Sequence, residues 1–132
     1  MIESLFLPLI AALSLAGAQP AEDNAPTAST QDEDQSAALA KLSAEDRAAL
    51  RCSAAFAIVT NRAGGGGVIQ QELRERGREF FVVTLANLMD KHSLDRGTIE
   101  REVRTEAREL SGPGKADEIM PACLLMLQSA GL

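Results

Sequence analysis

The chain has 132 residues, with 19 acidic and 13 basic side chains, no Trp or Tyr and only four Phe. This length accommodates one small domain. The net charge of −6 is unevenly placed, because every Lys and Arg lies at or beyond Lys41 and residues 41–132 are formally neutral. A neutral domain lacks the basic surface that nucleic-acid binding requires, so we expect no nucleic-acid partner.

Residues 1–18 form an apolar N-terminal segment that predicts a cleaved signal peptide. The apolar run extends from Leu5 to Ala16, and small residues up to Ala18 follow, as at a cleavage site. Only Glu3 precedes the run, where signal peptides usually carry Lys or Arg, so an ordinary N-terminal helix and an uncleaved membrane anchor remain alternatives. As a helix, residues 5–18 would span about 21 Å against a hydrocarbon core of roughly 30 Å, which disfavours the anchor. We therefore expect an exported protein, periplasmic in a Gram-negative cell, with membrane association only through an uncleaved signal.

Residues 19–40 are rich in Ala, Ser, Thr, Pro and acidic side chains and contain no basic residue. Such a segment buries too little apolar surface to offset its conformational entropy, so we expect a disordered acidic spacer. A role as an acidic recruitment arm is the alternative. The folded domain is then expected to occupy residues 41–132.

Four helices are predicted in residues 41–132, because apolar residues recur there at intervals of three and four. The first follows Ser43, a capping residue, and ends near Asn61 before the glycines at 64–67. We interpret the four glycines as a flexible connector, because no Lys-Ser or Lys-Thr follows them as in a phosphate-binding loop.

The second helix is expected over residues 68–90. Gly77 falls on its apolar stripe, where glycine costs about 1 kcal/mol relative to alanine, so we expect a close approach of another helix or a kink. Phe80 and Phe81 point about 100° apart and can contact two neighbouring elements. We expect a groove near Gly77, Phe80 and Phe81 to bind a protein partner.

The third helix is expected to begin after Asp95, which can act as its N-cap, with Leu94 packing on Ile99. It should end at residues 111–114, where two glycines and a proline prevent its continuation.

The fourth helix is expected over residues 117–129, with Asp117 as its cap and Pro121 in its first turn. Its sequence is apolar almost all round, which is typical of a helix surrounded by others. We therefore expect the core of the domain to be built around this last helix.

Cys52 and Cys123 lie on apolar stripes of the first and last predicted helices, 71 residues apart. An exported protein can oxidise them, and the bond would contribute about 4 kcal/mol in the chain-entropy model. A redox pair would have the short C-x-x-C spacing, so we predict a structural disulfide, with free buried thiols as the alternative.

The residues that carry chemistry are few. His92, the single histidine, is expected to have a surface or capping role at the end of the second helix. One histidine and two bridged cysteines cannot make a transition-metal site of the usual ligand count, and the carboxylates alternate with arginines as on a solvated helix face. We therefore expect no catalytic, cofactor or metal site and do not expect an enzyme.

Three segments resemble those of a known class of proteins: RCSAAFAIV (Arg51–Val59), RGREFFV (Arg76–Val82) and IMPACLLML (Ile119–Leu127). They resemble segments of small uncharacterised exported helical proteins from high-GC Gram-negative bacteria, a family of unknown function. The resemblance covers most of residues 41–132 and implies no activity. In size, helix content and single disulfide, the chain is also similar to the small periplasmic acid-stress chaperones.

These observations predict an all-α bundle of four helices clamped by one disulfide and preceded by a signal peptide and a spacer. The expected function is a non-enzymatic interaction module of the cell envelope. A periplasmic chaperone that exposes its last helix on acidification is the first alternative, and a small enzyme is the second.

Overall fold

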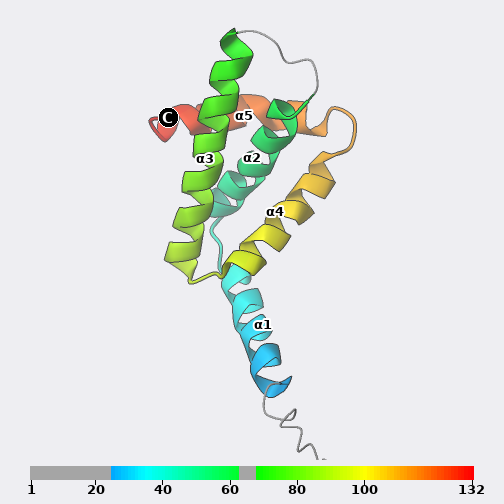
Figure 1. Ribbon diagram of the computed structural model, residues 1–132, viewed down its shortest axis with the longest axis vertical. Coiled ribbons are helices and arrows are strands. Elements are labelled where there is room, and N and C mark those ends of the chain that lie inside the picture. Colours follow the sequence, from blue (N-terminus) through cyan, green and yellow to red (C-terminus); the bar gives the residue numbers. More distant parts are fainter. Residues whose placement is uncertain (1–24, 63–67) are drawn as a thin grey trace, which may run out of the picture.

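The computed structural model describes residues 25–62 and 68–132, and its regular elements are all α-helices (Figure 1). They are α1 (Ala25–Ala40), α2 (Ala44–Thr60), α3 (Val68–His92), α4 (Arg96–Leu110) and α5 (Lys115–Ser129). The predicted all-α class is therefore confirmed for the described residues. The predicted signal peptide, the first residues of the spacer and the four-glycine connector lie outside them. None of the described helices is both long and apolar enough to cross a membrane.

Helix α1 differs from the prediction, because it occupies most of the segment expected to be a disordered spacer and raises the number of described helices to five. It points away from the other helices in Figure 1, and its C-terminal end packs on the domain through Ala38 and Leu39. The Gln35 amide donates a hydrogen bond to the Ser93 carbonyl at 3.2 Å and accepts one from the Asp95 N–H at 2.8 Å. Alanine is the strongest helix former, and these contacts anchor a helix that composition alone does not predict.

Helix α2 lies at the centre of the bundle, because α3, α4 and α5 all pack mainly on it. Its residues 52–56 are all buried, so this stretch is enclosed on every side. Small side chains at Ser53, Ala54 and Ala55 let the neighbouring helices approach closely. The prediction that the last helix forms the centre is therefore wrong.

Helix α5 begins at Lys115, and its N-cap residue is Gly114 rather than Asp117. Gly114 has a φ of 74°, a left-handed conformation that glycine adopts without strain, and this turn starts the helix two residues earlier than predicted. Pro121 therefore lies in the second turn and not in the first, on an exposed side of the helix. Leu124 and Leu125 are also exposed, so α5 is a peripheral helix with one buried face.

The starts of α2 and α4 confirm the predicted caps. Ser43 Oγ accepts a hydrogen bond from the backbone N–H three residues on at 3.0 Å, and Asp95 Oδ1 accepts the equivalent bond at 2.7 Å. Leu94 and Ile99, on either side of the second cap, are buried in one apolar cluster. Side-chain caps satisfy backbone donors that the first turn of a helix leaves unpaired, so both helix starts are fixed locally.

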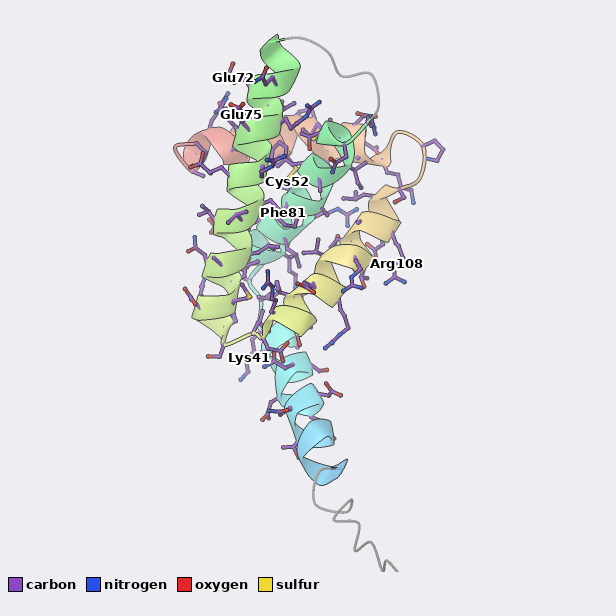
Figure 2. All side chains as sticks on the ribbon, in the orientation of Figure 1. Lys41, Cys52, Glu72, Glu75, Phe81 and Arg108 are labelled. Atoms are coloured by element: carbon purple, nitrogen blue, oxygen red, sulfur yellow. A yellow bond between two sulfur atoms is a disulfide. The ribbon has the colours of Figure 1, made fainter. Side chains whose placement is uncertain are left out.

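The predicted disulfide is confirmed and joins α2 to α5 (Figure 2). The Cα atoms of Cys52 and Cys123 are 5.3 Å apart, and both side chains are buried in the apolar cluster that contains Phe56 and Phe80. These two rings meet edge to face with centroids 5.4 Å apart. The disulfide therefore crosses the core and ties the peripheral α5 to the central helix.

Candidate functional site

An apolar groove separates α3 from α4, and we call it the α3–α4 groove. Its volume is about 490 Å³. It is lined by Phe81, Val82, Leu85, Ala86, Met89, Arg96, Ile99, Glu100, Val103 and Arg104. Apolar side chains make up most of its walls, and the charged residues all come from α4.

The groove exists because α3 and α4 diverge from a short connection while both pack on α2 (Figure 1). The chain turns at Ser93, whose φ of 53° is left-handed, and the Leu94 N–H donates to the Met89 carbonyl at 3.0 Å. Asp95 then caps α4. The residues that line the groove consequently all come from α3 and α4.

Burial differs between the floor and the rim of the α3–α4 groove. Leu85 and Ile99 form a buried floor that belongs to the second apolar cluster of the bundle. Phe81 and Val103 are half-buried, and Val82 is 59% exposed at the rim. Removing apolar surface from water contributes about 25 cal/mol per Å², so covering these side chains would favour association.

A second hollow of about 280 Å³ adjoins the α3–α4 groove, with Phe81 as their shared wall. Its other lining residues are Ala57, Thr60, Asn61, Arg74, Gly77 and Arg78. We call the two hollows together the extended groove. The α3 positions that line it recur at helical spacing from Arg74 to Met89, a distance of about 22 Å at 1.5 Å per residue.

The extended groove carries an excess of positive charge. Arg74, Arg78, Arg96 and Arg104 line it, whereas Glu100 is the one acidic residue among its lining residues. Glu100 forms ion pairs with Arg96 at 3.2 Å and with Arg104 at 3.8 Å. A net positive groove therefore lies on a chain whose overall net charge is −6.

The three residues predicted to bind a partner have different positions. Phe81, which is labelled on α3 in Figure 2, lines both hollows of the extended groove. Gly77 borders the smaller hollow and lets α2 approach closely, because a Cβ at this position would lie 3.3 Å from the Cβ of Phe56. Phe80 is buried against Phe56 in the core. The expected close approach of another helix at Gly77 is thus confirmed, and of the two phenylalanines Phe81 is the one at the groove.

Sequence reasoning missed the contribution of α4 and of the C-terminal half of α3. The α3 residues Phe81, Val82, Leu85 and Met89 repeat at helical spacing beside the core stripe that contains Phe80. A second apolar stripe on one helix is the signal that could have indicated the groove. The divergence of α4 from α3 has no comparable local signal.

A polar cluster joins the start of α2 to the end of α3. Asp46 Oδ2 lies 2.8 Å from His92 Nε2 and 3.0 Å from Lys91 Nζ. Desolvation by burial acts to raise the pKa of Asp46, but hydrogen bonds from Lys91, His92 and Ser43 outweigh it and lower this pKa to about 2. His92 thus binds a carboxylate at the end of α3, and the cluster holds two helices together.

The described residues contain no group of His, Cys, Asp and Glu side chains that could hold a metal ion. The partly buried Glu106 accepts a hydrogen bond from Arg51 at 3.2 Å, which links α4 to α2. Desolvation raises the pKa of Glu106, although the Arg51 charge opposes the shift. Asp46 and Glu106 therefore both belong to contacts between helices.

Comparisons with known proteins give no relative from which a function could be transferred. A scan against protein-family models, a search of curated proteins and a search of solved structures each return no match.

Proposed function

We propose that this chain is a non-enzymatic interaction module of the cell envelope and that the α3–α4 groove binds a segment of another protein. The observation that carries the proposal is the juxtaposition of exposed Val82 and half-buried Phe81 with Val103 across an apolar floor. Helix-in-groove recognition uses such a surface, in which an amphipathic helix places its apolar face between two others.

The fold supports this role because the groove walls are held from behind. Both α3 and α4 pack on α2, and the buried disulfide ties α2 to α5. A pre-formed groove lowers the entropy cost of binding, since little of the protein has to be ordered. Export would supply the oxidising compartment in which such a disulfide persists.

Photo-cross-linking tests this function in the cells that express the protein. A photoreactive phenylalanine analogue at Val82 is expected to give a discrete adduct with another protein. The same analogue at Arg108, an α4 position that does not line the groove (Figure 2), is the matched control. Loss of the adduct in a Val103→Asp background would support the groove as its origin. Equal adducts from both positions, or none at Val82, would contradict the proposal.

Acid-conditional chaperone activity is a second candidate, because ion pairs connect each of α3, α4 and α5 to α2 or to the residues just after it. Arg51 pairs with Glu106 of α4 at 3.2 Å, and Arg62, just after α2, pairs with Asp117 of α5 at 2.8 Å. Asp46 of α2 pairs with the end of α3. At low pH, the loss of negative charge would leave the cations of the bundle to repel one another.

Asp46 and Glu106 act in opposite directions in this second candidate. The pKa of Asp46 lies below its usual value, so its stabilising contribution is lost as the pH falls from about 4 to about 2. The pKa of Glu106 is raised, so its protonation favours the folded state. Opening of the bundle is therefore expected only near pH 2 to 3, and binding of a hydrophobic dye there would support the chaperone. Retained tertiary structure without dye binding at that pH would exclude it.

A further inference from the structure

We propose that the extended groove selects an acidic amphipathic helix, which specifies the partner class and rests on the proposed function. The inference combines the apolar floor of the groove with the excess of arginines along its walls. The occupant would carry large apolar residues at i, i+3 or i+4 and i+7, flanked by Asp or Glu.

The positions of the arginines favour carboxylates on the flanks of such a helix. Arg74 and Arg78 border the hollow beside α2, and Arg96 and Arg104 border the wall formed by α4. Glu100 neutralises part of the α4 charge, and no carboxylate among the described residues forms an ion pair with Arg78. Complementary charges at the rim of an interface raise the association rate and exclude partners of the wrong sign.

The dimensions of the groove fit one helix of about four turns. The α3 wall from Arg74 to Met89 extends over about 22 Å, the length of roughly 15 helical residues. Two adjoining hollows along that wall provide separate places for apolar side chains, and Phe81 divides them. A helical occupant would repeat its apolar side chains about every 5.4 Å, the rise per turn of the α3 wall itself, whereas an extended peptide would repeat them about every 6.6 Å.

The α1 helix of a second copy is acidic but is a poorer occupant. Asp32, Glu33 and Asp34 supply the charge, whereas Ala38 and Leu39 are already packed on their own domain. Its first described side chains include no large apolar residue between Thr30 and Ala38. We therefore assign the groove to a different protein, and self-association is one outcome of the test.

The test measures binding of two labelled 18-residue model helices by fluorescence anisotropy. Both carry the same leucine stripe, one with Glu and the other with Lys on the flanks. The disulfide-bonded full chain is expected to bind the Glu helix at least tenfold more tightly than the Lys helix at low salt. The double variant Arg78→Glu/Arg104→Glu should remove this preference. The control Arg108→Glu should retain it, because Arg108 lies on α4 like Arg104 but outside the groove. Each exposed charge pair changes the binding affinity by up to about fivefold, so reversing two of them accounts for the tenfold change in affinity.

Each other outcome overturns a defined part of the account. Equal binding of both helices, abolished by Val82→Asp, would leave the interaction module intact and refute the acidic preference. Binding of neither helix by a protein whose circular dichroism is native would refute the helix-in-groove inference, while the cross-linking experiment tests the docking function separately. Concentration-dependent dimers in sedimentation, abolished by Val82→Asp, would assign the groove to a second copy and refute our assignment.

Discussion

Replacing both Cys52 and Cys123 with alanine is expected to lower the free energy of unfolding by about 4 kcal/mol. The bond closes a separation of 71 residues, and the chain-entropy model gives this value for a loop of that length. Small domains have a total stability of about 5–15 kcal/mol, so the variant should be close to the limit of folding. Because α5 packs mainly on α2, we expect α5 to lose its protection first.

Urea unfolding followed by far-ultraviolet circular dichroism measures this effect, since the chain has no Trp or Tyr to report by fluorescence. At a slope of about 1–2 kcal/mol per M, the midpoint should fall by at least about 2 M. Wild-type protein reduced with a phosphine is the control, because it loses the bond but keeps both sulfur atoms in the core. A decrease below about 1 kcal/mol in both samples would refute the reasoning.

Three further predictions concern single positions. Gly77→Val should lower the free energy of unfolding in urea by about 1–3 kcal/mol, because even a Cβ at this position would lie 3.3 Å from the Cβ of Phe56. Unchanged stability would contradict the close approach. Asp46→Asn should lower the free energy of unfolding at pH 7 by about 1 kcal/mol, a value that allows for solvent screening. The loss should be much smaller at pH 2, because the pKa of Asp46 is about 2 in the folded protein. An equal loss at both pH values would count against the ion pair. Gln35→Ala should accelerate amide hydrogen exchange in the C-terminal half of α1 without changing exchange in α2, and slow exchange retained in α1 would show that these hydrogen bonds do not anchor it.

Local signals in the sequence were sufficient for several parts of the fold. Ser43 and Asp95 cap helices because their short side chains reach backbone donors within the same turn. The pairing of Cys52 with Cys123 followed from two cysteines on apolar stripes. The close approach of a helix at Gly77 could be predicted, because glycine is costly inside a helix and is expected there where a neighbour leaves no room for a side chain.

Features that depend on contacts distant in the sequence could not be predicted in this way. The docking of α1 depends on Gln35, whose partners lie 58 and 60 residues away. Helix α2 is central because its small side chains let the other helices approach closely. The prediction placed α5 at the centre instead, because the sequence of α5 is apolar almost all round. Phe81 was predicted at the groove, but its opposite wall is set by the angle between α3 and α4, and no local pattern encodes that angle.

Chemical-shift mapping of the full chain with the Glu-flanked model helix is the most direct test of the central claim. We predict that the largest amide shifts occur at Phe81, Val82 and Val103, on the two walls of the α3–α4 groove. Shifts centred on the exposed Leu124 and Leu125 of α5 would instead place the binding surface on a different helix and contradict the account.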